Sequence, residues 1–357
     1  MNQSIVAKLV GAEYDVFDKF FTTILTDITR ITTDLEQEPL SVAKNWIERV
    51  FRFNVPHGKK IRGLLVPILV RSLVKCPSTE KMTQAYTLGW CVEILQASSL
   101  IADDVMDKSK LRRGKPCWYL VDDLGTDAVN DSFLLEHIMY QLVKKHFKTT
   151  SYYTDIVDLF LLVTHKTVLG QCLDIQTGRN MRFEEYTMER YEAIVKYKTS
   201  FYTFYLPIVL AATISNVQNT KLMSIFEALA ISIGHMFQVL DDYLDCYGSK
   251  SKTGKIGTDI QNGKCSWLFV RSKELCSKEQ LAELYDNYGH DDEAKIAHVV
   301  EIYEAVKIPS HVTEFMKHMK ASNLRLIRKL ENEDLIILFK QLLGMVTETF
   351  NMSSLCL

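Results

Sequence analysis

Proline and glycine are scarce in this sequence, with 7 and 15 residues among 357. So few turn-forming residues exclude a sandwich or barrel of many short hairpins and favour long helices. The eight cysteines are scattered and none forms a Cys-x-x-Cys pair, which argues against a zinc ribbon and predicts free thiols in a reducing compartment. We find no strand-like alternation, no tandem repeat and no low-complexity tract. The sequence therefore predicts an all-α protein.

An excess of one charge is also lacking. Forty-two basic residues face 44 acidic ones, for a formal net charge of −2, which argues against a nucleic-acid binder held by bulk positive charge. No apolar run approaches the roughly 20 residues that a membrane span needs, and the N-terminal residues look like neither a secretory leader nor a transit peptide. We expect a cytoplasmic protein without a membrane span, folded as one helical domain over residues 1–357.

Helical periodicity is strongest in two long segments, residues 79–108 and 219–247. In the second segment, apolar residues recur at steps of one, three or four, which gives one apolar face over about seven turns. Ten shorter helical segments are expected at 5–35, 40–53, 60–75, 126–147, 152–177, 183–197, 200–214, 258–275, 291–306 and 310–348. These lengths and their short connections predict a bundle.

Each of the two long segments ends in an acidic cluster with the spacing Asp-Asp-x-x-Asp. The clusters are Asp103, Asp104 and Asp107, and Asp241, Asp242 and Asp245. The first and fifth positions of such a cluster lie one above the other on a helix, so that both carboxylates point to one place. Mg²⁺ relieves the resulting repulsion, because it binds carboxylates together with phosphate oxygens and water. A solvated helix end explains one cluster equally well, but two in the same context favour a metal-dependent diphosphate site.

Basic residues flank both acidic clusters. The segment 58–63, Gly-Lys-Lys-Ile-Arg-Gly, follows a loop and opens a helix, where free backbone N–H groups suit a phosphate. Further basic residues follow each cluster or lie in the second half of the chain, namely Arg112, Arg113, Lys198, Lys255 and Lys264. Each of them alone is most simply a surface charge, but their placement around both clusters predicts anion binding.

Six blocks of sequence together resemble one known family in order and spacing. They are GKKIRG, LIADDVMDKSKLRRGKPCWY, GQCLD, YKTSFYTFYLP, FQVLDDYLDCYG and KTGKIGTDIQNGKCSWL. Over about residues 40–290 the chain resembles the farnesyl diphosphate synthase branch of the trans-isoprenyl diphosphate synthases. The resemblance implies an all-α bundle around a deep central cavity, usually in a homodimer. It also implies elongation of an allylic diphosphate by isopentenyl diphosphate with three Mg²⁺ ions, for which Mn²⁺ can substitute.

The resemblance also assigns roles to residues at matching positions. The metal ligands would be Asp103, Asp104, Asp107, Asp241, Asp242 and Asp245, supported by Gln171, Asp174 and Asp259. The allylic diphosphate would be bound by Arg112, Lys198 and Lys255, and isopentenyl diphosphate by Lys59, Arg62, Arg113 and Gln96, with Lys264 as a further substrate contact. Thr199 and Gln238 would join Lys198 in catalysis by facing the allylic cation. The bound diphosphate itself would accept the final proton, so no catalytic histidine is needed.

The sequence departs from the family pattern in the pocket and at its end. Bulky aromatic residues commonly stand four and five positions before the first aspartate and form the pocket floor, but Ser99 and Ser98 stand there. A small floor predicts a deeper cavity and a product that can exceed C15. The family's basic C-terminal cluster is replaced by Phe-Asn-Met-Ser-Ser-Leu-Cys-Leu at 350–357, which weakens the expected second-substrate site.

These departures leave two alternatives to chain elongation. A terpene synthase built on this scaffold would ionise a prenyl diphosphate such as farnesyl diphosphate to a hydrocarbon or alcohol without isopentenyl diphosphate. The four expected contacts for that second substrate, Lys59, Arg62, Gln96 and Arg113, are all present, so the elongating enzyme is favoured. A non-catalytic subunit would be expected to lose metal ligands, and all six aspartates are intact.

Overall fold

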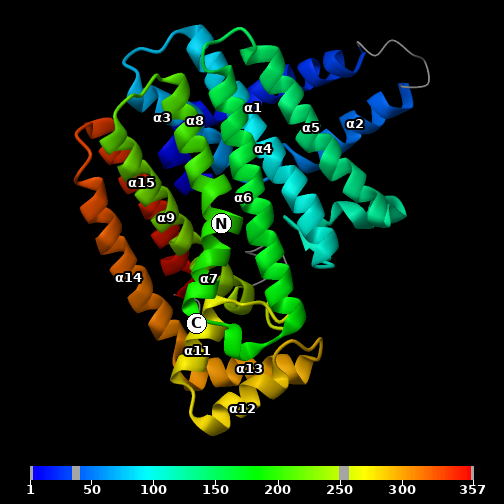
Figure 1. The fold of residues 1–357 in the computed structure, drawn as a ribbon, viewed down its shortest axis with the longest axis vertical. Coiled ribbons are helices and arrows are strands. Elements are labelled where there is room, and N and C mark those ends of the chain that lie inside the picture. The colour runs from blue at the N-terminus through cyan, green and yellow to red at the C-terminus, as the bar shows by residue number, and fades with distance from the viewer. Residues whose placement is uncertain (1–2, 34–40, 249–256, 355–357) are drawn as a thin grey trace.

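A computed structural model of the chain describes residues 3–33, 41–248 and 257–354. Long helices packed side by side make up most of it, as Figure 1 shows. The first half contains α1 (Gln3–Thr33), α2 (Ser41–Asn54), α3 (Ile61–Leu73), α4 (Thr79–Met106), α5 (Ala128–Phe147) and α6 (Tyr153–Asn180). Between α4 and α5 lie the two-residue strands β1 (Leu111–Arg112) and β2 (Lys115–Pro116) and the short helices η2 (Trp118–Asp123) and η3 (Gly125–Asp127).

The second half continues the bundle. It contains η4 (Phe183–Glu185), α7 (Met188–Ile194), η5 (Val195–Tyr205), α8 (Leu206–Ile214), α9 (Thr220–Tyr247), α11 (Trp267–Leu275), α12 (Lys278–Asn287), α13 (Glu293–Ala305), α14 (Ile308–Ile327) and α15 (Glu333–Ser354). The prediction of an all-α fold is confirmed. The small exception is the hairpin of β1 and β2, whose turn residues Arg113 and Gly114 both have positive φ, at 54° and 78°, as tight two-residue hairpins require.

The two long predicted helices are confirmed as α4 and α9. Side-chain oxygens start both: Ser78 accepts a hydrogen bond from Lys81 N, and Asn219 accepts one from Leu222 N. Such caps satisfy amides that a helix leaves unpaired at its first turn. Both helices have many buried residues, so the acidic clusters at their C-terminal ends are held on rigid elements.

Some predicted boundaries are wrong. The segment 310–348 is two helices, because the chain turns after Ile327 and Asn332 restarts it by accepting a hydrogen bond from Leu335 N. The predicted helices at 183–197 and 200–214 are instead joined through η5, an 11-residue π-helical segment. Such segments are rare and frequently mark functional sites. Helix α12 was not predicted at all.

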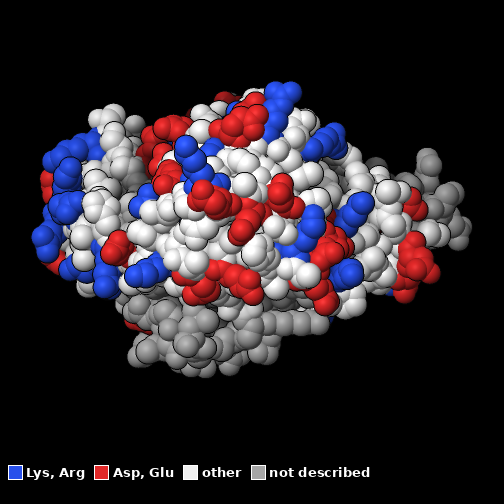
Figure 2. All heavy atoms as spheres, turned by 90° about the horizontal axis from the view of Figure 1, so that it is seen from below, with Lys and Arg blue, Asp and Glu red and all other residues white. Residues whose placement is uncertain are grey.

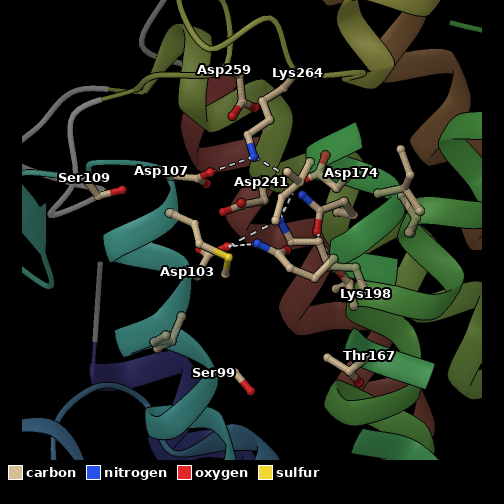
Figure 3. A pocket seen from close by; sticks show the side chains of 18 of the residues that line it. Ser99, Asp103, Asp107, Ser109, Thr167, Asp174, Lys198, Asp241, Asp259 and Lys264 are labelled. Atoms are coloured by element: carbon tan, nitrogen blue, oxygen red, sulfur yellow. Dashed lines mark hydrogen bonds and ion pairs between the residues drawn. The ribbon is translucent and has the colours of Figure 1, made fainter. Parts of the chain in front are cut away.

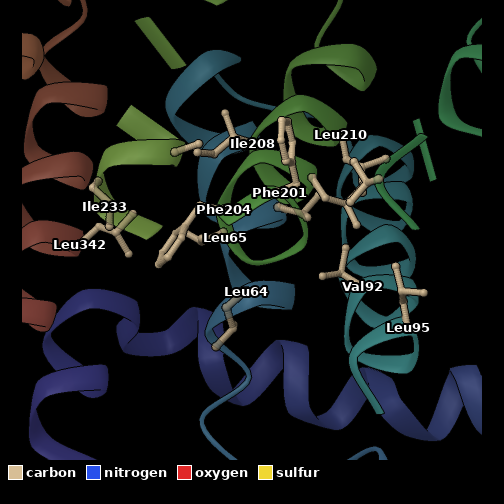
Figure 4. Close-up of a cluster of buried hydrophobic side chains, with 14 of the residues drawn as sticks. Leu64, Leu65, Val92, Leu95, Phe201, Phe204, Ile208, Leu210, Ile233 and Leu342 are labelled. Atoms are coloured by element: carbon tan, nitrogen blue, oxygen red, sulfur yellow. The ribbon is translucent and has the colours of Figure 1, made fainter. Parts of the chain in front are cut away.

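A buried apolar core extends from Phe17 in α1 to Val346 in α15. Figure 4 shows a part of it, in which α3, α4, α8 and α9 each contribute aliphatic side chains and η5 contributes Phe201 and Phe204. Dense packing of this kind leaves little freedom to the backbone. The core therefore fixes the positions of the helices that surround the cavity.

Two helices, α6 and α9, are long and apolar enough to cross a membrane by length and composition. Core helices of globular proteins pass the same test, and both of these carry residues that line the central cavity. On the face drawn in Figure 2, basic and acidic side chains lie interspersed, in keeping with the net charge of −2.

Candidate active site

A cavity of about 710 Å³ lies between α4, α6, η5 and α9, within the size range of small-molecule sites. Figure 3 shows charged residues gathered at one end of it, and Ser99 and Thr167 toward the other. Seventeen of the residues predicted for the site line this cavity. They are Arg62, Gln96, Ser99, Asp103, Asp107, Arg112, Arg113, Gln171, Asp174, Lys198, Thr199, Gln238, Asp241, Asp242, Asp245, Asp259 and Lys264.

Asp103 and Asp107 at the end of α4 point into the cavity. The amide of Gln171 donates to Asp103 Oδ1 at 3.0 Å, and Lys198 Nζ lies 3.5 Å from the same oxygen. Lys264 Nζ donates to Asp107 Oδ1 at 2.9 Å. Groups from α6, η5 and the segment before α11 thus converge on the first acidic cluster, although they are far apart in the sequence.

Asp104, between them in the sequence, faces away from the cavity. Its side chain is buried, and Arg112 Nε donates to its two oxygens at 3.0 and 3.3 Å. Burial raises the pKa of Asp104, and the adjacent guanidinium opposes that shift. Among the described residues, the cavity lining does not include Asp104. The geometry gives this carboxylate the task of anchoring the β1–β2 hairpin, not of facing the predicted metal.

The second acidic cluster divides in the same way. Asp241 and Asp245 line the cavity, and Asp245 Oδ2 accepts hydrogen bonds from the backbone amides of Thr258 and Asp259, both at 2.9 Å. Asp242 is 4 % exposed and accepts from Trp267 N at 2.8 Å. Burial raises the pKa of Asp242 to about 7. Asp242 therefore caps α11 from the cavity wall, while its two neighbours in the cluster remain directed at the cavity.

A hydrogen-bonded series connects Asp242 with η5. Thr199 Oγ1 donates to Gln238 Oε1 at 2.8 Å, and Gln238 Nε2 donates to Asp242 Oδ1 at 2.9 Å. Because the hydroxyl proton of Thr199 is used in this bond, its oxygen lone pairs are left for other partners. Thr199 thus offers an acceptor at the cavity wall.

Asp174 on α6 holds two lysines beside the first cluster. It accepts from Lys198 Nζ at 2.7 Å and from Lys264 Nζ at 2.9 Å. Burial raises the pKa of Asp174, but the two ammonium groups outweigh it and hold this pKa well below its usual range. Burial lowers the pKa of Lys198, whereas Asp174 and Asp103 raise it further, to well above the usual value. The lysines and aspartates therefore keep one another charged inside the cavity.

A second cationic region lies where α3, α4 and the hairpin meet. Arg62 donates through Nε to Thr203 Oγ1 at 3.1 Å and through Nη2 to Tyr202 Oη at 3.0 Å. Arg113 Nη1 lies 3.5 Å from the carbonyl oxygen of Asn54. Both arginines line the cavity, at a place distinct from the contacts of the aspartates.

Four predicted residues lie elsewhere. Lys59 is exposed at the start of α3 and is not among the described residues of the cavity lining, and Lys255 lies outside the described residues. Ser98 faces α5, where Ser132 Oγ donates to its carbonyl oxygen at 2.9 Å. Only Ser99 of the predicted floor therefore lines the cavity, because successive residues of a helix point about 100° apart. Asp104 is the fourth, as described above.

The donor set fits a hard divalent cation. Asp103, Asp107, Asp241 and Asp245 offer only carboxylate oxygens to the cavity, which Mg²⁺ prefers over nitrogen or sulfur ligands. No group of three His, Cys, Asp or Glu residues in the described part of the chain could hold a metal by itself. This suits Mg²⁺, which usually takes one or two carboxylates and completes its shell with substrate phosphates and water.

The comparisons with known proteins agree with this geometry. The family model for polyprenyl synthetase matches residues 44–306. The chain belongs to the polyprenyl synthetase family. This polyprenyl synthetase is 39% identical over 327 residues to the farnesyl pyrophosphate synthase of Gallus gallus, which covers 90% of this chain and 88% of the relative. It is 41% identical over 279 residues to that of Saccharomyces cerevisiae, which covers 76% and 79%.

A solved structure supports the same family. T. brucei farnesyl diphosphate synthase complexed with risedronate matches this polyprenyl synthetase with a TM-score of 0.88 at 31% identity, over 93% of this chain and 98% of that one. The resemblance drawn from the motifs is therefore confirmed, as is the isoprenoid synthase fold. The chain is a short-chain trans-prenyltransferase, and the terpene synthase alternative is not favoured.

Proposed function

We propose that this enzyme joins isopentenyl diphosphate to an allylic diphosphate, dimethylallyl or geranyl, to give farnesyl diphosphate or a somewhat longer product. One observation carries the proposal: Arg62, Gln96 and Arg113 line the same cavity as the aspartates but lie apart from their contacts. An enzyme that only ionises and cyclises a prenyl diphosphate needs one anion site. A second cationic region supports a second diphosphate substrate.

In this proposal, Asp103 and Asp107 on α4 and Asp241 and Asp245 on α9 hold Mg²⁺, in the family's complement of three ions, with Mn²⁺ as a substitute. When bound, Mg²⁺ neutralises negative charge that develops on the departing diphosphate. Lys198 and Lys264, and Lys255 by resemblance, would add cationic contacts to the same leaving group. Gln171, Asp174 and Asp259 would support this arrangement, since they bind or neighbour these groups.

The chain's own residues also protect the allylic cation. Phe237 and Tyr202 contribute aromatic surface to the wall near Arg62, and a wall of this kind excludes water that would quench a cation. The lone pairs of Thr199, polarised by the bond to Gln238, would face the cation with a fixed partial negative charge. Positioned dipoles need no reorganisation during the reaction, so they favour the charged state.

The test is to incubate the purified protein and Mg²⁺ with C5, C10 and C15 allylic diphosphates, with and without isopentenyl diphosphate. We expect longer diphosphates only when isopentenyl diphosphate is present. Hydrocarbons or alcohols formed without it, before any phosphatase treatment, would instead support a terpene synthase. Release of diphosphate only when Mg²⁺ is present would exclude a non-catalytic subunit.

The product length is expected to depend on Ser99. This residue lines the cavity one helical turn, about 5.4 Å, before Asp103, and its hydroxyl is bonded to Leu95 O at 3.1 Å. A phenylalanine there would fill the space that a growing chain needs beyond C15. In Ser99→Phe we expect products longer than C15 to disappear and C15 or shorter ones to remain. The matched control is Ser98→Phe, which faces α5 and should lower stability instead, and an unchanged Ser99→Phe product profile would contradict the assignment.

Three further proposals concern the whole chain. We propose a homodimer, supported by large apolar side chains on α5 and α6 that are more than half exposed, namely Phe133, Leu161, Val168 and Leu169. Sedimentation at the monomer mass would contradict it. We also propose a single domain, since the core connects α1 with α15, and a cytoplasmic location, since the seven described cysteines are free thiols. A protease-resistant fragment or a secreted form would contradict these two.

A further inference from the structure

Glu93 on α4 is a buried carboxylate that the proposed reaction does not use. Its residue is 2 % exposed, and taking a carboxylate out of water is costly unless hydrogen bonds and cations compensate. Burial raises the pKa of Glu93, while Arg62, Arg113 and Lys60 together lower it. Two of these three cations, Arg62 and Arg113, line the proposed site for isopentenyl diphosphate.

The first contact of Glu93 fixes the start of α3. Gly63 N donates to Glu93 Oε1 at 2.7 Å. Lys60, the residue before α3, has a φ of 52° and makes no side-chain cap, so Glu93 supplies from α4 a cap that the α3 sequence lacks. A Cβ atom on Gly63 would lie 2.6 Å from the carbonyl oxygen of Gly89, so that the backbones of α3 and α4 touch here. Arg62, one residue earlier, is thereby held at a defined distance from α4.

The second contact of Glu93 fixes the amide of Gln96, three residues later on the same helical face. With the amide oriented by its partners, its nitrogen donates to Glu93 Oε2 at 3.2 Å and its oxygen accepts from Arg62 Nη1 at 2.9 Å. An ionised carboxylate can only accept hydrogen bonds, so it forces the amide nitrogen toward itself and the amide oxygen toward Arg62.

These contacts leave Arg62 poised for an anion. Its guanidinium gives one hydrogen bond through each nitrogen, to Thr203, Tyr202 and Gln96. Each terminal nitrogen of a guanidinium carries two hydrogens, so among the described contacts one hydrogen on each remains. Two such hydrogens can bind a phosphate in the two-point manner typical of arginine.

We propose that Glu93 is a positioning residue for the second substrate: through Gly63 and Gln96 it sets Arg62 and Gln96 for isopentenyl diphosphate. The inference rests on the proposed function and deepens it. Glu93 itself does not touch the substrate in this arrangement. Its charge is spent on the α3 amide and the Gln96 amide, and it offsets the surplus positive charge of a site that is otherwise lined by arginines.

The test is Glu93→Gln, which keeps the shape but not the acceptor-only chemistry. The new amide can satisfy Gly63 with its oxygen only by turning its nitrogen toward Gln96, which then flips and presents its own nitrogen to Arg62. We expect the KM for isopentenyl diphosphate to rise about tenfold, equivalent to one lost hydrogen bond, with less than a twofold change in the KM for the allylic substrate. Glu80→Gln, an exposed glutamate in the first turn of α4, is the matched control and should change neither.

A double-mutant cycle separates positioning from general stability. If Glu93 acts through Gln96, Glu93→Gln should add little to the KM change already caused by Gln96→Leu. Calorimetric titration of each variant with isopentenyl diphosphate reads binding directly. Glu93→Asp keeps the charge but is one methylene shorter, so it should fold and show a smaller increase of the same KM if Glu93→Gln does not fold.

The outcomes distinguish this inference from the proposed function. A wild-type protein that never consumes isopentenyl diphosphate would overturn the proposed function. A wild-type protein that consumes it, with unchanged KM and binding in Glu93→Gln or Glu93→Asp, would overturn the role of Glu93 alone. Equal increases in both KM values together with a lower melting temperature would reduce Glu93 to a structural residue and would also overturn the inference.

Discussion

Replacing Asp241 by asparagine is expected to lower kcat on the order of 10³-fold, the size of effect seen when one preorganised electrostatic group is removed from a transition state. Asp241 lines the cavity opposite Asp103, as Figure 3 shows. Asparagine keeps the volume of the side chain but removes the charge, so the cavity loses attraction for a divalent cation and for the charge that develops on the leaving diphosphate. Asp103→Asn should act in the same way from the other wall.

The measurement is steady-state turnover over a range of Mg²⁺ concentrations, with melting temperature as the check on folding. We expect the Mg²⁺ concentration for half-maximal activity to increase and the fold to persist, because removing one of several neighbouring carboxylates also removes repulsion. Asp158→Asn is the matched control, since Asp158 is exposed on α6 and should change neither quantity. Turnover within threefold of the wild type would remove Asp241 from the metal site.

The sequence predicted the parts of the fold that depend on local periodicity. The apolar repeats of 79–108 and 219–247 were sufficient to predict α4 and α9 nearly to the residue. The break between α14 and α15 was not predicted, because it depends on Asn332, which also donates to Ser72 O across the bundle. The π-helical turn of η5 leaves no mark in the periodicity, since its cause lies in contacts with α6 and α9.

The site was predicted to the same depth. Helical spacing brings Asp103 and Asp107 to one face, and the structure agrees. It does not tell which partner a side chain between them will meet, and Asp104 and Asp242 turn to Arg112 and to the start of α11. The role of Tyr202 in holding Arg62 was missed for a similar reason, because an aromatic residue in a run of aromatics is most simply core packing.

Replacing Gly170 by alanine is expected to cost more than either of these serine or glutamate substitutions, because the backbone of η5 lies directly against α6 at this glycine. A Cβ atom on Gly170 would lie 2.2 Å from Lys198 N and 2.6 Å from the carbonyl carbon of Tyr197. No side chain can rotate to relieve contacts with backbone atoms. The segment that carries Lys198 and Thr199 must therefore move, and it cannot move freely, since Ser200 is packed against Gly234 of α9 on its other side.

We expect Gly170→Ala to lower the free energy of unfolding by at least about 1–3 kcal/mol, the usual cost of overpacking, and to lower kcat at least about 100-fold as Lys198 and Thr199 are displaced. Alanine favours a helix over glycine by about 1 kcal/mol, so the sign of the effect reports the clash alone. Gly344→Ala on α15 is the matched control, because its Cβ would meet only Glu348 Oε1 at 4.0 Å and should leave stability equal or higher. Urea unfolding and turnover check both variants, and a Gly170→Ala protein as stable and active as the wild type would show that α6 does not seat the catalytic segment.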